Sequence, residues 1–170
     1  MTAYEIDHIL MPLSNAFQKR NIYSMSKKIL IATHTILAEG LRKATMFFTG
    51  EGEDFVTICA YEDTQEPPRA EIDHFFDSVQ PEDTVVVFTD LIGGSVNQIM
   101  MEKLLTQKFH LISDPNLSAV MAVATLGEDE INAESIRESL DLCKAQMKYV
   151  NDVQLGQAGQ AEADAEDSFF

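Results

Sequence analysis

Apolar residues along this chain follow two kinds of pattern: short continuous runs, and longer stretches in which they recur every three or four residues. The runs predict buried strands at residues 28–33, 55–60, 84–88 and 109–112. The helical spacing predicts helices at about residues 35–48, 72–79, 95–104, 117–125 and 132–148. Strands that alternate with helices in this way are typical of βαβ units, in which the strands lie parallel.

This order of elements predicts an α/β fold with an open, mainly parallel four-stranded sheet flanked by helices. Because crossovers between parallel strands are right-handed, the first and third strands can lie side by side, which gives the strand order 2-1-3-4. The point where the order reverses then lies between these two strands, at their carboxyl ends. Near the end of the chain, residues 147–155 contain Tyr149, Val150 and Val153 and could add a last edge strand.

The length of 170 residues, with 45% hydrophobic content, suits one globular core. We expect that domain to occupy residues 27–150. We expect residues 1–26 to form an N-terminal arm. Three interpretations of it stay open: a short docking helix, a disordered arm, and a mis-assigned start, in which translation begins at Met25. Residues 151–170 form the end of the edge strand and an acidic tail without apolar periodicity, which is typical of disorder.

Acidic residues outnumber basic ones by 28 to 12, which gives a formal net charge of −16 at pH 7. This excess argues against direct binding to nucleic acid or to an anionic membrane surface and favours a basic protein partner. No apolar stretch approaches the roughly 20 residues that a membrane-spanning helix needs, so membrane insertion is not expected. Glu5 and Asp7 precede any basic residue, unlike in a signal peptide, and Cys59 and Cys143 show no disulfide spacing. We therefore expect a cytoplasmic protein.

The first predicted strand ends at a histidine, and the third is followed by an aspartate. His34 comes directly after the run 28–33, and Asp90 follows the run 84–88 after one threonine. The carboxyl ends of neighbouring parallel strands meet at one edge of the sheet, so we expect His34 and Asp90 to face the same crevice. A carboxylate bound to one ring nitrogen fixes the tautomer and leaves the other nitrogen free as a nucleophile.

The residues around this pair are suited to binding an anion. Gly93 and Gly94 allow a close backbone approach, and Ser95 begins a predicted helix, whose first N–H groups attract negative charge. Thr33 and Thr35 add hydroxyl donors beside the histidine. The sequence has no metal-binding histidine pair, no Asp-rich loop and no nucleotide-binding glycine motif, so neither a metal nor another cofactor is expected. Together these features predict a histidine that carries a phosphoryl group.

From Lys27 to about Val150 the chain resembles the EIIA domain of the mannose/fructose/sorbose-type family of the bacterial phosphoenolpyruvate-dependent sugar phosphotransferase system. Two motifs carry this resemblance, and the second is the more specific. The first is a strand that leads through Thr33-His34 into a helix, and the second is a strand followed by Thr89-Asp90, Gly93-Gly94-Ser95 and Asn97.

The resemblance implies a phosphotransferase that works through a phosphohistidine. His34 would accept a phosphoryl group from the phosphocarrier protein HPr and donate it to a histidine of the EIIB component. Asp90 would hold the imidazole by a hydrogen bond, and Ser95 would support the phosphate. The membrane components EIIC and EIID would be reached only indirectly. The family fold also implies a homodimer in which an antiparallel edge strand, here within residues 147–155, is exchanged between the two chains.

Two other functions stay open at this point. A related EIIA-like domain is the phosphodonor subunit for dihydroxyacetone kinase, and the first motif alone does not exclude it. The chain also departs from the family at two positions: Ala32 stands where relatives usually have glycine, and Thr35 stands where they have glycine or serine. These departures are compatible with a non-catalytic regulatory or scaffold module that keeps the fold and binds proteins through its surface.

Overall fold

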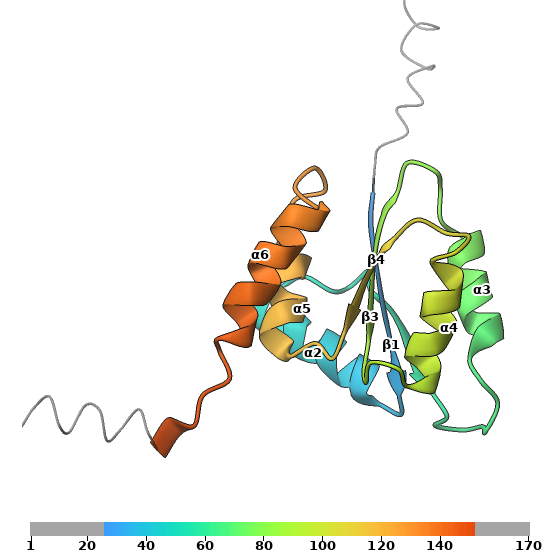
Figure 1. Ribbon diagram of the computed structural model, residues 1–170, viewed down its shortest axis with the longest axis horizontal. Helices are drawn as coiled ribbons and strands as arrows, with labels where there is room; N and C mark the ends of the chain where they lie inside the picture. Colours follow the sequence, from blue (N-terminus) through green and yellow to red (C-terminus); the bar gives the residue numbers. More distant parts are fainter. Residues whose placement is uncertain (1–25, 152–170) are drawn as a thin grey trace, which may run out of the picture.

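The computed structural model of the protein describes residues 26–151, and these residues form four strands and five helices (Figure 1). The strands are β1 (Lys27–His34), β2 (Val56–Ala60), β3 (Thr84–Thr89) and β4 (His110–Ser113). The helices are α2 (Leu37–Thr49), α3 (Arg69–Asp77), α4 (Ser95–Lys103), α5 (Leu117–Ala124) and α6 (Ala133–Lys144). Each strand and helix predicted from the apolar pattern is therefore present, with small shifts at the ends.

All four strands are parallel, in the order β2-β1-β3-β4, which confirms the predicted fold class. β1 lies in the middle of the sheet, between β2 and β3. Its register with β3 pairs Ala32 with Thr89. The residues just beyond this pair, His34 and Asp90, therefore leave two neighbouring strands at the same edge of the sheet.

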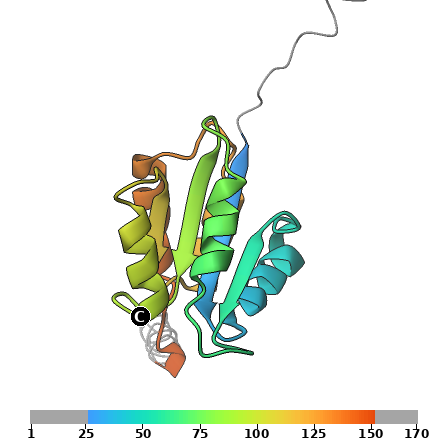
Figure 2. The ribbon, with the colours of Figure 1, turned by 90° about the vertical axis from the view of Figure 1, so that its right-hand side faces the viewer.

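Helices cover both faces of the sheet. In Figure 1 the sheet is seen nearly edge-on, with α2, α5 and α6 on one side and α3 and α4 on the other. In Figure 2, α3 and α4 face the viewer and lie over the strands. Within residues 26–151, none of the helices is both long enough and apolar enough to cross a membrane.

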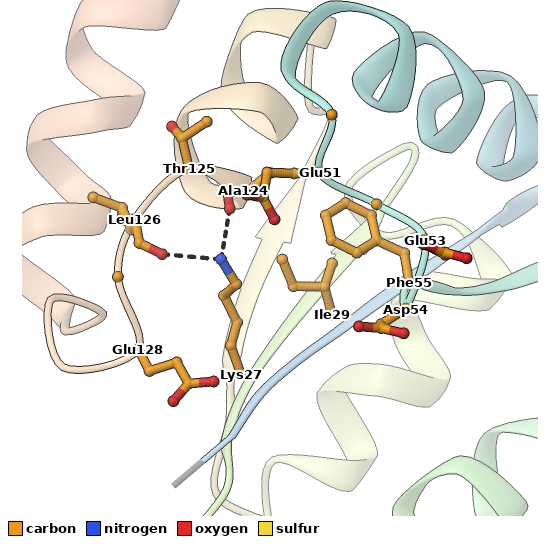
Figure 3. Close-up of a pocket in the computed structure, with 13 residues that line it drawn as sticks. Lys27, Ile29, Glu51, Glu53, Asp54, Phe55, Ala124, Thr125, Leu126 and Glu128 are labelled. Atoms are coloured by element: carbon orange, nitrogen blue, oxygen red, sulfur yellow. Dashed lines mark hydrogen bonds between the residues drawn. The ribbon is translucent and has the colours of Figure 1, made fainter.

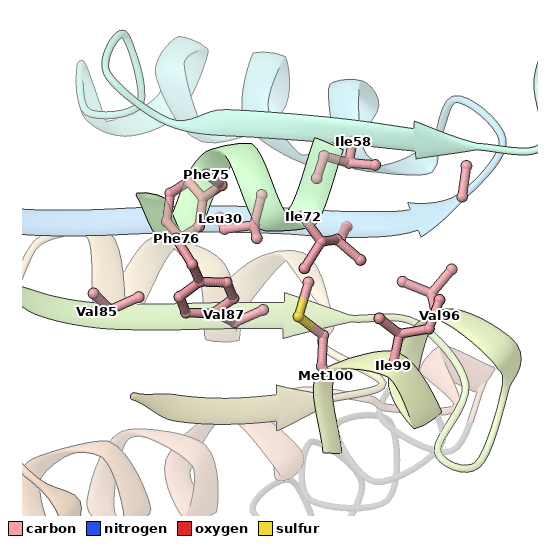
Figure 4. Close-up of a cluster of buried hydrophobic side chains, with 12 residues drawn as sticks. Leu30, Ile58, Ile72, Phe75, Phe76, Val85, Val87, Val96, Ile99 and Met100 are labelled. Atoms are coloured by element: carbon pink, nitrogen blue, oxygen red, sulfur yellow. The ribbon is translucent and has the colours of Figure 1, made fainter. Parts of the chain in front are cut away.

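Two apolar clusters hold these layers together, because successive side chains of a strand point to opposite faces. On β1, Leu30 and Ala32 belong to the cluster beneath α3 and α4 (Figure 4), whereas Ile29 and Ile31 belong to the cluster beneath α2, α5 and α6. This alternation assigns a face to every side chain of the strand. It places His34 on the face of α3 and α4.

The end of the chain differs most from the prediction. The last helix stops at Lys144, four residues before the predicted end at residue 148. The described part of the expected edge strand, residues 147–151, forms no strand. The rest of that segment lies outside the described residues, as do the N-terminal arm up to residue 25 and the acidic tail. The exchanged edge strand and the roles of both ends stay predictions.

Candidate functional site

The site forms where β1 and β3 end. The Nδ1 atom of His34 lies 2.7 Å from Oδ2 of Asp90, and the same oxygen accepts the backbone N–H of His34 at 2.8 Å. These two contacts fix both the ring and the backbone of His34 against one carboxylate. The His34 side chain is 38% exposed and that of Asp90 is 12% exposed, so the imidazole faces solvent while its partner is shielded.

This geometry assigns the protonation of the imidazole. An ionised carboxylate can only accept hydrogen bonds, so Nδ1 of His34 carries the proton and donates it to Asp90. In the neutral ring Nε2 then holds a free electron pair, which accepts a hydrogen bond from Oγ of Ser95 at 3.0 Å. The lone pair of Nε2 therefore points toward the start of α4.

The Asp90 carboxylate contacts His34 through one oxygen, Oδ2. Its second oxygen, Oδ1, is buried and has no hydrogen-bond partner among the described residues. The negative charge of Asp90 is consequently compensated mainly through the imidazole. A ring that becomes positively charged when Nε2 forms a bond is stabilised by this arrangement.

The amino end of α4 is open to an anion. Its N-cap is Gly94, which has an extended backbone and no side chain to bind the first N–H groups of the helix. Gly93 has a φ of 74°, a conformation that favours glycine, and its N–H is bound by Oδ1 of Asn97. A Cβ atom on Gly94 would lie 3.0 Å from the carbonyl oxygen of Leu91, so the turn also favours glycine at its second position. The free N–H groups and the positive end of the helix dipole suit a phosphate next to Nε2.

The two threonines expected to support a phosphate are placed differently from each other. Thr33 is fully buried on the face opposite His34, and its hydroxyl accepts the N–H of Ala38 at 2.8 Å. It caps α2 and supports the loop rather than an anion, because side chains alternate along the strand. Thr35 is exposed beside His34, with a φ of 51°. Glycine adopts this left-handed backbone freely, whereas it costs a threonine about 1–2 kcal/mol.

Asn97 belongs to the second sequence motif, which predicts no role for it, whereas the structure shows a structural role. Asn97 is 1% exposed, and its Nδ2 donates to the hydroxyls of Thr89 at 2.9 Å and Ser113 at 2.6 Å. Together with the bond to Gly93, this buried amide ties the ends of β3 and β4 to the turn before α4. A polar residue at a buried position of an apolar helix face was the available signal, since buried amides need partners.

Tyr61, which follows β2 directly, is a residue of the site that the sequence motifs do not predict. Its ring stacks on the imidazole of His34, with 5.3 Å between the ring centroids and 20° between the planes. Nothing in the sequence around Tyr61 indicates this contact, because it depends on β2 lying next to β1 in the sheet.

The other described histidines lie elsewhere. His74 is on α3, and His110 begins β4 at the opposite edge of the sheet from His34. Burial and the nearby Lys108 lower the pKa of His110, which keeps it uncharged at neutral pH. In the described part of the chain, neither histidine donates a hydrogen bond to a carboxylate, as His34 does to Asp90. Among the described histidines, His34 is therefore the candidate for a functional role.

A cavity of about 510 Å³ lies at the amino ends of the strands (Figure 3). Its one cation, Lys27, already donates to the carbonyls of Ala124 and Leu126. Carboxylates dominate the rest of its polar lining: Glu51, Glu53, Asp54 and Glu128. This cavity is at the far end of β1 from His34, and its negative charge is unsuited to a phosphate.

The fold and the site together define a class of protein: an open α/β domain that presents a carboxylate-held histidine at the switch point of its sheet, opposite an uncapped helix. The family described as the phosphotransferase system (PTS) fructose IIA component, EIIA-man, matches residues 28–141. The chain belongs to this family of sugar phosphotransferase components.

Solved structures support this assignment. A phosphoenolpyruvate-dependent sugar phosphotransferase system permease from Klebsiella pneumoniae is 26% identical, with a TM-score of 0.69, over 76% of this chain and 94% of that one. The PTS IIA protein associated with the fucose utilization operon of Streptococcus pneumoniae is 21% identical, with a TM-score of 0.66, over 77% and 98% of the two chains. The mannose/sorbose-specific IIA subunit from Enterococcus faecalis is 19% identical, with a TM-score of 0.60, over 73% and 94%. The last two show the fold alone, and no curated protein matches this chain in sequence.

Proposed function

We propose that this protein accepts a phosphoryl group on Nε2 of His34 from HPr and donates it to the EIIB component of a sugar uptake system. One observation carries the proposal. The 2.7 Å contact between Nδ1 of His34 and Asp90 leaves Nε2 unprotonated and directed at Ser95, at the start of α4. Membership of the EIIA-man family supports the same function.

The transfer needs little covalent machinery. The electron pair on Nε2 of His34 attacks phosphorus, an N–P bond forms, and the bond from phosphorus to the donor breaks, with its electrons returning to the donor. No proton has to move at Nε2, because Nδ1 keeps its proton throughout. The ring becomes cationic and is stabilised by Asp90, while Ser95 and the first N–H groups of α4 bind the phosphoryl oxygens. The same steps in reverse deliver the group to EIIB.

The surface around His34 suits a protein donor rather than a small molecule. Four large apolar side chains that closely follow His34 or Asp90 in the chain are exposed: Ile36 at 63%, Leu37 at 48%, Leu91 at 66% and Ile92 at 80%. A partner that covers these side chains would exclude water from the transfer and place its own histidine against Nε2. The net charge of −16 favours a basic partner.

Intact-protein mass spectrometry tests the proposal. The protein is incubated with phosphoenolpyruvate, enzyme I and HPr, and one aliquot is then treated with acid. We expect one acid-labile phosphoryl group on the wild type and on the control His74→Ala, and none on His34→Ala. Equal labelling of His34→Ala would refute the role of His34. Circular dichroism of the variant should match the wild type, because His34 is a surface residue at the end of its strand.

The acceptor is tested with the phosphorylated protein. Transfer to EIIB in the absence of a nucleotide-holding kinase subunit is the expected result. Transfer only to a dihydroxyacetone kinase subunit would place the protein in that system instead. If HPr becomes phosphorylated and this protein does not, although it binds HPr, the regulatory or scaffold module is the better description.

A further inference from the structure

Tyr61 covers one face of the reactive imidazole. The two rings are stacked, 5.3 Å apart between centroids and 20° from parallel. The hydrogen bonds with Asp90 and Ser95 act at the edge of the His34 ring, where Nδ1 donates to the carboxylate and Nε2 accepts from the hydroxyl. They leave both faces uncovered, so the stack with Tyr61 restrains a direction that the hydrogen bonds do not.

Tyr61 has a strained backbone conformation in this position. Its φ is 62°, in the left-handed region that is uncommon for a bulky aromatic residue. The preceding residue, Ala60, accepts the N–H of Thr35 through its carbonyl at 2.7 Å, which joins the end of β2 to the loop after His34. The half-buried Tyr61 side chain also packs against the apolar cluster beneath α3 and α4. Strained residues that the surrounding contacts maintain are concentrated at functional sites.

We infer that Tyr61 is a positioning residue for phosphoryl transfer: its ring keeps the imidazole of His34 oriented with Nε2 toward α4 and stabilises the cationic ring formed on phosphorylation. This inference rests on the proposed function. The first effect follows from steric contact with the face of the ring. The second follows from the attraction between an aromatic face and a cation.

Two variants separate the ring from the backbone. Tyr61→Phe keeps the aromatic face and removes only the hydroxyl. Tyr61→Asn removes the face but is tolerated in a left-handed backbone, so the loop keeps its conformation. Steady-state transfer from phosphorylated HPr gives kcat and KM for each variant. We expect Tyr61→Phe to stay within about twofold of the wild type and Tyr61→Asn to lose about tenfold in kcat with little change in KM.

A second measurement does not need phosphoryl transfer. Carbon–proton NMR spectra report the ring protons of His34, assigned by comparison with His34→Ala. A stacked aromatic ring shifts these protons upfield, so we expect the same positions in the wild type and Tyr61→Phe and a downfield shift in Tyr61→Asn. This result would support the stack even if HPr failed to phosphorylate the wild type, which would contradict the proposed function separately.

Three results would overturn the inference. One is a Tyr61→Asn variant that transfers as fast as the wild type. Another is a slower variant whose His34 ring signals have not moved, which would assign the effect to the loop. The third is a rise in KM with kcat retained, which would make Tyr61 a docking residue for HPr.

Discussion

The junctions from β1 to α2 and from β3 to α4 occupy equivalent places at the switch point of the sheet, yet they are built in opposite ways. At the first junction the chain closes its own helix end, because Thr33 binds the N–H of Ala38 from the buried side. At the second, Gly94 leaves the first N–H groups of α4 without a side-chain cap. One junction presents the imidazole of His34, and the other leaves backbone N–H donors without a side-chain partner.

The two junctions therefore have different roles in the site. Thr33 holds its loop internally, so His34 can be exposed without the loop losing its shape. The second junction contributes Asp90, which orients the ring, and leaves the start of α4 without a side-chain cap, as the proposed binding of a phosphoryl group requires. Closing the second helix end, or opening the first, should therefore have different consequences for rate and for stability.

Asp90→Asn should have the largest effect of the variants that test this division. The amide oxygen of asparagine would still accept the backbone N–H and the Nδ1 proton of His34, but the negative charge that stabilises the cationic phosphorylated ring would be lost. We expect the transfer rate from phosphorylated HPr to fall about 10³-fold, with the fold retained. Rapid-quench measurement of phosphorylated protein checks this.

Asp114→Asn is the matched control for that prediction. Asp114 follows β4 at the same edge of the sheet, and with a φ of 53° it sits in a conformation that asparagine also adopts. Its variant should transfer at the wild-type rate. A similar loss in both variants would mean that general charge at this edge, and not the bond to His34, sets the rate.

Ser95→Ala should have an intermediate effect. It removes the hydroxyl 3.0 Å from Nε2 but leaves the backbone N–H groups of α4 in place. We expect transfer to slow by about 10- to 100-fold, since other donors to the phosphoryl oxygens remain. Ser118→Ala, at the second residue of α5, is the control and should not change the rate. A Ser95→Ala rate equal to the wild type would assign phosphate binding to the backbone alone.

The strand order and the meeting of His34 with Asp90 could both be predicted from the sequence. The apolar runs determine the strands, and right-handed crossovers then limit their order, so the meeting of His34 and Asp90 follows from local patterns and one topological rule. Ser95 could be predicted for the same reason, because the glycines before it mark a turn into a helix. These features depend on residues close together in the sequence.

Features that depend on packing were missed or misplaced. Tyr61 reaches His34 only because β2 pairs with β1, and its left-handed backbone has no sequence signal. Thr33 was expected at the phosphate, although the two-residue period of a strand places it on the face opposite His34. The sequence predicts the end of α6 at residue 148 rather than at Lys144, because residues 145–148 contain no glycine or proline that would mark an earlier end.

Thr33→Val should have the smallest effect on transfer and a clear effect on stability. The variant has nearly the same shape but leaves the buried N–H of Ala38 without its acceptor. We expect the free energy of unfolding to fall by about 1–2 kcal/mol and the transfer rate to stay within twofold of the wild type. Urea unfolding at one fixed protein concentration, alongside the HPr assay, measures both.

Thr45→Val sharpens this prediction, because it makes the same substitution at another buried threonine, in α2, without breaking a hydrogen bond among the described residues. Thr45 is also fully buried, but its hydroxyl has no partner among the described residues. Replacing an unsatisfied hydroxyl by a methyl group should leave stability unchanged or raise it. If both variants lost the same stability, the cause would be the general cost of replacing a buried threonine by valine, and the claim that Thr33 closes the first junction would fail. If only Thr33→Val lost stability while keeping its transfer rate, the first junction would be a structural closure and the second alone would bind the anion.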